Sequence, residues 1–188
     1  MCEMMISECV AAPFPHAYWV IPGKFMAGGY PGGDAPETTI HNLQALYNAG
    51  IRHIVNLVRS EEFACGLKRL CRYEDQLSAM VSSNGFSLAM DQMPVKDTWI
   101  PTRPEMGKIL DRIDDCLDNG KPVYVHCWGG IGRTGTVVGC FLIRHGFAAD
   151  NDVIRRIQKL RKCTENSDIS SPETASQLDM VRSWVRWE

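Results

Sequence analysis

One short segment constrains the fold of this chain more than any other. It reads His126-Cys127-Trp128-Gly129-Gly130-Ile131-Gly132-Arg133-Thr134. The apolar residues 123–125 before it predict a short buried strand, and residues 134–145 predict a helix that ends at Gly146. Glycines let successive backbone N–H groups turn toward one point, and a helix start adds a partial positive charge. The segment therefore predicts a strand, an anion-binding loop and a helix in succession.

Two side chains of this loop carry reactive chemistry. A free thiol has a pKa of about 8.5, which a helix N-terminus and nearby cations lower, so we expect Cys127 to be a thiolate nucleophile. Arg133 offers a planar fork of donors that matches two phosphate oxygens and stabilises transition-state charge. We expect His126 to shape the loop by hydrogen bonding rather than to act as a base, and Thr134 to donate its hydroxyl to the thiolate. The expected phosphate-binding residues are Trp128, Gly129, Gly130, Ile131, Gly132 and Arg133.

At these positions the chain resembles the cysteine-dependent protein phosphatases. Their signature of His-Cys, five residues, Arg and then Ser or Thr is matched at every defined position. The resemblance extends from about Tyr18 to Trp184, and the short length is similar to the small dual-specificity branch. It implies hydrolysis of phosphotyrosine, and also of phosphoserine and phosphothreonine, in a phosphorylated protein or peptide. It also implies a cysteinyl-phosphate intermediate and no metal or other cofactor.

Cleavage by a thiolate also needs an acid that protonates the leaving oxygen. Asp97 is the candidate, because it lies in the turn-prone residues 96–101, which could cover the loop. Asp91 is the competitor, but it falls inside a predicted strand. In the resembling family a proline, two residues and then the aspartate place this acid, as Pro94 and Asp97 do here.

Two departures from the family bear on the substrate and on the water. Ile131 stands where phosphoinositide-directed relatives often carry lysine, which disfavours an inositol lipid substrate. Residues 173–178 look similar to a segment in which tyrosine-specific relatives position water with glutamine, although the first residue here is Glu173. Gln177 or Glu173 could assist in this way, or both could be ordinary residues of a first helical turn.

The remaining pattern alternates helices and strands. Helices are predicted at 36–50, 61–83, 102–120 and 150–162, and a last one from a capping box at 170–173; strands are predicted at 51–58 and 86–95. This alternation predicts an α/β fold with a central, mostly parallel sheet of about four to five strands flanked by helices. With 188 residues, 45% of them hydrophobic, we expect an N-terminal arm over residues 1–17 and a single catalytic domain over residues 18–188.

Composition excludes several other classes. A net charge of -2 gives no general attraction to nucleic acid or anionic membranes, and neither a signal peptide nor an apolar span is evident, so we expect a soluble, cytoplasmic monomer. The eight cysteines form no Cys-x-x-Cys pair, which favours reduced thiols, and the histidines show no metal-ligand spacing. Cys65 and Cys71 are expected to be buried thiols, or alternatively partners of an oxidised Cys127. A basic run at residues 155–162 is expected to be a solvated helix face.

Two other functions would use the same loop. The first is a phosphoprotein-binding module with low turnover, against which the presence of Cys127, Arg133 and Asp97 argues. The second is a rhodanese-like or arsenate-reducing enzyme, but sulfur-transfer relatives usually have a shorter loop and no upstream acid. The sequence therefore favours a phosphatase.

Overall fold

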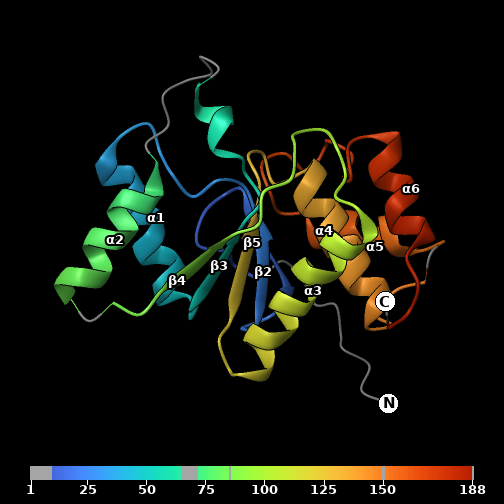
Figure 1. Cartoon of the computed structure of the whole chain (residues 1–188), viewed down its shortest axis with the longest axis horizontal. Helices are drawn as coiled ribbons and strands as arrows, with labels where there is room; N and C mark the ends of the chain where they lie inside the picture. Colours follow the sequence, from blue (N-terminus) through green and yellow to red (C-terminus); the bar gives the residue numbers. More distant parts are fainter. Residues whose placement is uncertain (1–9, 65–71, 85, 150, 188) are drawn as a thin grey trace.

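The computed structural model describes residues 10–64, 72–84, 86–149 and 151–187, and its centre is a five-stranded sheet (Figure 1). The strands are β1 (Ala17–Ile21), β2 (Phe25–Gly28), β3 (His53–Asn56), β4 (Ala89–Gln92) and β5 (Val123–His126). Their order across the sheet is β1-β2-β5-β3-β4, and every neighbouring pair is parallel except β1 with β2. The expected mostly parallel α/β fold is confirmed, and β5 lies at its centre.

Helices cover both faces of this sheet, as Figure 1 shows, with α1 and α2 on one side and α3 to α6 on the other. The helices are α1 (Pro36–Asn48), α2 (Tyr73–Asn84), α3 (Arg103–Asp118), α4 (Gly132–Arg144), α5 (Val153–Leu160) and α6 (Ala175–Ser183), and a short 3-10 helix, η1, spans Ser60–Ala64. The predicted capping box of α3 is present, since the Thr102 hydroxyl accepts from the Glu105 N–H and Glu105 accepts from the Thr102 N–H.

The two faces of the sheet form two hydrophobic cores. Successive side chains of a strand point to opposite faces, so Val123 and Val125 of β5 pack toward α3 and α4, whereas Tyr124 packs with residues of α1 and α2. Strand β5 contains only buried residues, because helices cover both faces of the sheet. A strand buried on both faces is a nearly continuous apolar run and not an alternating pattern. Helix α4 starts directly after the loop and is buried along most of its length, which anchors the loop to the core.

The structure differs from the predictions at three places. The antiparallel hairpin β1–β2 was not predicted, because its two short strands flank a tight turn and give little periodic signal. A single helix over 61–83 is wrong at its start, where η1 is a 3-10 helix, and residues 65–71, with Cys65 and Cys71, lie outside the described residues. Helix α6 is capped by Thr174 with Gln177 at its third position, not by the serines at 170–171.

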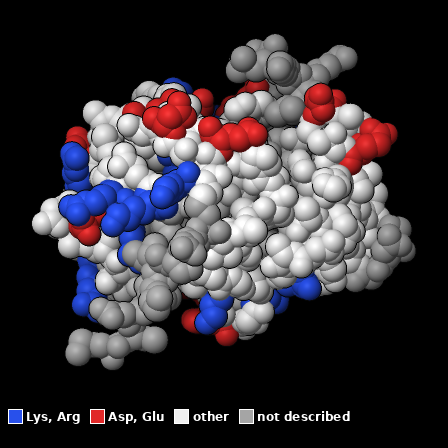
Figure 2. Space-filling view, turned by 180° about the vertical axis from the view of Figure 1, so that it is seen from behind, with Lys and Arg blue, Asp and Glu red and all other residues white. Residues whose placement is uncertain are grey.

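The basic run at 155–162 lies mostly on the surface, but one member does not. Basic side chains gather over α5 on the face seen in Figure 2. Arg155 and Lys159 of this helix are exposed. Arg161 instead is only 1% exposed, and it donates to the Ile169 and Asn166 carbonyls at 2.7 and 2.8 Å. Its charge therefore organises the turn after α5 and is not part of the solvated helix face.

The described cysteines are not all reduced. Cys116, Cys127 and Cys140 are buried and form no disulfide, whereas Cys163 is disulfide-bonded, so the expectation of reduced thiols is wrong at that position. Its spacing from the other cysteines gave no indication of pairing. Within the described ranges no helix combines the length and apolar character needed to cross a bilayer.

Candidate active site

The loop after β5 holds its backbone carbonyl groups outward. The Trp128 carbonyl accepts from the Tyr30 N–H at 2.9 Å, the Gly129 carbonyl from Asn166 Nδ2 at 3.0 Å, and the Ile131 carbonyl from the Ser171 hydroxyl at 2.8 Å. In a planar trans peptide the N–H points opposite to the carbonyl of the same unit. The N–H groups of the same peptide units therefore point to the inner side of the loop, which begins at Cys127. This arrangement suits an anion.

Two glycines of the loop lie close to neighbouring segments. Gly130 has a φ of +72°, and a Cβ there would lie 2.5 Å from the Gly28 carbonyl carbon. A Cβ at Gly132 would lie 2.9 Å from Gln177 Oε1 and 3.1 Å from Glu173 Oε2. At Gly130 only glycine allows the loop to approach the backbone of β2, whereas at Gly132 the close atoms are the ends of two side chains.

His126 is fixed as a neutral, structural group. Its Nδ1 donates to the Cys127 carbonyl at 3.1 Å, so in the neutral ring Nε2 accepts from the Tyr73 hydroxyl at 2.9 Å. Burial, with a smaller contribution from the charge of Arg133, lowers the pKa of His126 to about 3. The loop-shaping interpretation of His126 agrees with this geometry. Thr134 differs from its prediction, because its hydroxyl donates to the Gly28 carbonyl at 3.2 Å and its single proton does not reach the sulfur.

Arg133 is held rigidly from one end of its guanidinium. Its Nη1 and Nη2 donate to the two carboxylate oxygens of Glu62 at 2.7 and 2.9 Å, and Nη1 also donates to the Val95 carbonyl at 2.9 Å. Burial alone would lower the pKa of Arg133, but its hydrogen bonds to Glu62 and the charges of Cys127, Glu62 and Asp97 raise it above its ordinary value. The arginine is therefore a fixed cation beside Cys127.

The other edge of the same guanidinium carries the donors that matter for an anion. Within the described residues no group accepts from Nε, which is buried, and Nη2 lies 2.9 Å from Asp97 Oδ1. Nε and Nη2 form one fork of parallel donors, which matches two oxygens of a phosphate. Asp97, whose side chain is 62% exposed, therefore contacts the fork from the surface. The structure brings Asp97 to the site, as expected.

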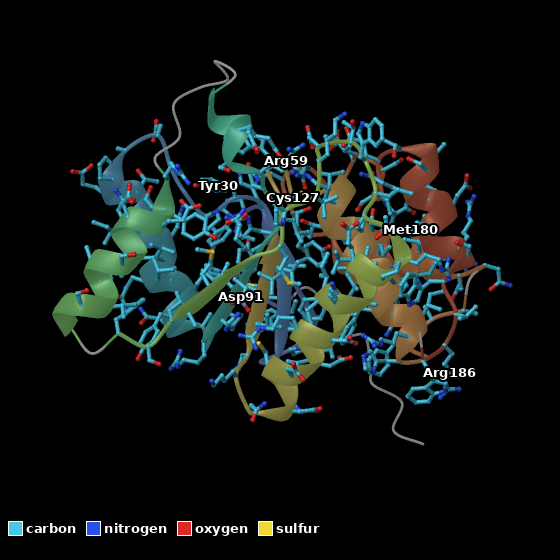
Figure 3. The ribbon with its side chains drawn as sticks, in the orientation of Figure 1. Tyr30, Arg59, Asp91, Cys127, Met180 and Arg186 are labelled. Carbon is cyan, nitrogen blue, oxygen red and sulfur yellow. The ribbon has the colours of Figure 1, made fainter. Side chains whose placement is uncertain are left out.

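The competing carboxylate lies elsewhere. Asp91, on the edge strand β4, accepts from His53 Nε2 at 2.9 Å and pairs with Arg112. In Figure 3 it lies apart from Cys127, because β3 separates its strand from β5. Asp91 is therefore part of a structural ion pair and not of this site.

Helix α6 links the loop to the segment that carries Asp97, residues 96–101, which we call the acid loop. The buried amide of Gln177 accepts through Oε1 from the N–H groups of Glu173 and Thr174, both at 3.1 Å, and donates through Nε2 to the Trp99 carbonyl at 3.2 Å. Capping and holding the acid loop are thus the visible roles of Gln177. These contacts favour the ordinary helix-start interpretation over positioning of water.

Sequence reasoning missed four residues that support the site. Glu62 orients Arg133, Tyr73 orients His126, and Arg161 with Asn166 supports the loop at Gly129. Glu62, Tyr73 and Asn166 reach their partners across 71, 53 and 37 positions, so no local spacing reveals them, and Arg161 acts through its contact with Asn166. No group of three or more His, Cys, Asp or Glu side chains that could hold a metal occurs in the part of the chain that the structure describes.

Comparison with known proteins places this geometry in a family. Residues 29–147 match the family model described as "Polymorphic toxin system, DSP-PTPase phosphatase". The matched range includes the whole loop, Glu62 and Asp97. The chain belongs to this family. The phosphatase-like chain is 34% identical over 94 residues to an uncharacterized protein of Methanocaldococcus jannaschii, covering 50% of this chain and 58% of that protein.

Other relatives carry phosphatase names. A putative tyrosine phosphatase of Invertebrate iridescent virus 3 is 28% identical over 132 residues, which cover 67% of this chain and 45% of that protein. This family member thus spans about half, or less, of the curated relatives it matches. Among solved structures, kinase associated phosphatase has a TM-score of 0.65 at 18% identity, covering 84% of this chain and 83% of that one. Tk-PTP in its active form has a TM-score of 0.62 at 21% identity, covering 91% and 97%. These structures share the fold.

Proposed function

We propose that this protein hydrolyses phosphate monoesters of phosphorylated proteins through a cysteinyl-phosphate intermediate. One observation carries the proposal: Arg133, whose pKa is raised in part by the charge of Cys127, has a buried Nε with no acceptor among the described residues, and Asp97 contacts Nη2 of the same fork. A phosphate seated there would be bound by the fork and by the N–H groups of the loop residues Trp128, Gly129, Gly130, Ile131 and Gly132. Nucleophile, cation and acid would then surround one phosphorus atom.

In the first step the phosphate takes the Nη2 donor, which frees the Asp97 carboxyl to move to the leaving oxygen. The Cys127 thiolate attacks phosphorus in line, and the sulfur–phosphorus bond forms as the bond to the leaving oxygen breaks. Asp97 gives its proton to that oxygen. Arg133, held by Glu62, and the loop N–H groups stabilise the charge on the three other oxygens.

In the second step the roles of the same groups reverse. The ionised Asp97 takes a proton from a water molecule, whose oxygen attacks phosphorus, and the sulfur–phosphorus bond breaks. Inorganic phosphate leaves and Cys127 returns as a thiolate. His126 stays neutral throughout, because its two ring nitrogens are occupied by the Cys127 carbonyl and Tyr73.

We further propose that phosphotyrosine and also phosphoserine and phosphothreonine residues are substrates. The dual-specificity description of the matched family supports this breadth. One structural neighbour, PTPMT1, was solved in complex with PI(5)P, so a phosphoinositide belongs in the test. Ile131 in place of a cationic loop residue favours protein over lipid.

The experiment compares wild-type protein with Cys127→Ser on an aryl phosphate, on phosphopeptides of all three types and on a phosphoinositide. We expect turnover of the aryl phosphate and the peptides by wild-type protein, and binding without turnover by Cys127→Ser. Cys116→Ser, which removes a buried thiol outside the loop, is the matched control and should stay active. Transfer of sulfur from thiosulfate or reduction of arsenate without phosphatase activity would refute the proposal, and so would full turnover by Cys127→Ser.

A further inference from the structure

A pocket of about 490 Å³ opens beside the candidate active site and is used by none of the steps above. The acid loop supplies one wall through Lys96, Ile100 and Pro101, and α3 supplies another through Glu105 and Lys108. Arg59, from the segment after β3, completes the rim. In Figure 3 Arg59 is drawn next to Cys127, at the same end of the sheet.

The pocket adjoins the guanidinium of Arg133 through two of its lining residues. The carbonyl of Val95, which lines the pocket, accepts from Arg133 Nη1 at 2.9 Å. The backbone N–H of Arg59 donates to Glu62 Oε1 at 3.0 Å, and that oxygen also holds Arg133. A ligand in the pocket would therefore lie within a few residues, along an extended peptide, of a phosphate held by the fork.

The charge around the pocket favours an anion. Arg59, Lys96 and Lys108 are cationic, and Glu105 is the one acidic residue among the lining residues. Both the backbone N–H and the hydroxyl of Thr102 donate to the Glu105 carboxylate at 2.7 Å, so it is already engaged in the α3 cap. The exposed pair of Arg59 with Glu61, at 3.5 Å, is of the kind that contributes little and exchanges readily. The available charge is thus positive.

The walls of the pocket are apolar below this rim. Met93, Val95, Ile100 and Ile109 line it, which suits the aliphatic part of a peptide side chain. Lys96 lies with its Nζ 4.0 Å from the centre of the Trp99 ring, so its charge is held over the acid loop. An occupant would touch the same loop that carries Asp97.

We propose that this pocket binds an anionic side chain of the substrate protein that lies close in sequence to the phosphorylated residue. The inference rests on the proposed phosphatase function. The shared chemistry is an acidic group on an extended peptide, which a glutamate or a second phosphorylated residue can supply. The pocket thus selects substrates by their flanking charge.

The test uses phosphotyrosine peptides that differ at one flanking position, which is glutamine, glutamate or phosphoserine. We expect kcat/KM to be about three- to tenfold higher for the acidic peptides than for the glutamine peptide, mainly through KM. This preference should shrink when the salt concentration rises from about 0.05 M to about 0.5 M. The glutamate and phosphoserine arms tell which anion the pocket takes better.

Variants of Lys108 separate this pocket from a general charge effect. Lys108→Gln should reduce the preference, and Lys108→Glu should reverse it, whereas Lys159→Gln, which removes an equal charge on α5, should leave it unchanged. Equal preference in wild-type protein and Lys108→Glu would overturn the inference, as would the absence of any preference. Either result with normal hydrolysis of an aryl phosphate leaves the proposed function intact, while inactivity on every substrate refutes the proposed function itself.

Discussion

Replacing Glu62 by glutamine tests how Arg133 is positioned. The carboxylate of Glu62 accepts from both Nη1 and Nη2 of an arginine whose side chain is 1% exposed, and the glutamate side chain is 21% exposed. Glutamine keeps one acceptor oxygen and loses the charge and the second acceptor. We expect Nη2 to shift toward Asp97, its remaining carboxylate partner at 2.9 Å, while Nη1 keeps its backbone acceptors, so that the fork is less well oriented for a phosphate.

The magnitude follows from the bond that is lost. A charge-assisted hydrogen bond contributes about 1.5–3 kcal/mol, and a loss of about 2 kcal/mol in transition-state stabilisation corresponds to about 30-fold in kcat/KM. Because Arg133 keeps its bonds to the Val95 and Leu57 carbonyls, the free energy of unfolding should fall by less than the roughly 3–5 kcal/mol typical of a broken buried pair.

Steady-state hydrolysis of an aryl phosphate, competitive inhibition by inorganic phosphate and thermal unfolding measure the three effects. Glu61→Gln is the matched control, since its side chain is 69% exposed and pairs with Arg59 at the surface. It should change kcat/KM by less than about twofold. Wild-type kcat/KM and wild-type phosphate inhibition in Glu62→Gln would refute the reasoning.

Three further substitutions are expected to give distinct results. Asp97→Asn should lower kcat by about 10²- to 10⁴-fold and remove the alkaline limb of the pH profile; an unchanged profile would exclude it as the acid. Gly130→Ala should lower the free energy of unfolding by about 2 kcal/mol in urea titrations, because position 130 has a φ of +72° and a close contact with Gly28. Gly129→Ala, whose nearest contact is at 3.6 Å, should destabilise the protein less, and equal effects would contradict this. The pKa of His126 is about 3 in the folded protein, against an ordinary 6.5 in the unfolded chain. Between these values only the unfolded chain binds the proton, so the free energy of unfolding falls as the pH falls. The wild-type protein should lose about 2 kcal/mol from this group between about pH 7 and pH 5, and His126→Gln should lack that part of the loss.

The sequence predicted those parts of the site that are continuous in the chain. Residues 123–144 form β5, the glycine loop and α4, each of which depends on a local pattern, and all three are present. Asp97 was found because the chemistry needs an acid and a turn-prone segment supplied one. In the structure Asp97 contacts Arg133.

What the sequence did not predict depends on contacts between distant segments. Glu62 reaches Arg133 across 71 positions and Tyr73 reaches His126 across 53, and neither separation leaves a periodic trace. The hydroxyl of Thr134 was expected to donate to the sulfur of Cys127, but β2 lies so close that the hydroxyl donates to the Gly28 carbonyl instead. Burial of Arg161 was equally hidden, because its neighbours on α5 are solvated cations.

The central claim is that Cys127 carries the phosphoryl group during turnover. The direct measurement mixes Asp97→Asn with a radiolabelled aryl phosphate whose leaving group needs no proton, so that the intermediate forms quickly and is hydrolysed slowly. The reaction is quenched in neutral denaturant, and the labelled peptide is identified by mass spectrometry. We expect close to one phosphoryl group per chain on Cys127, and no label in Cys127→Ser. Continued turnover with an unlabelled Cys127, or label on another residue, would contradict the account.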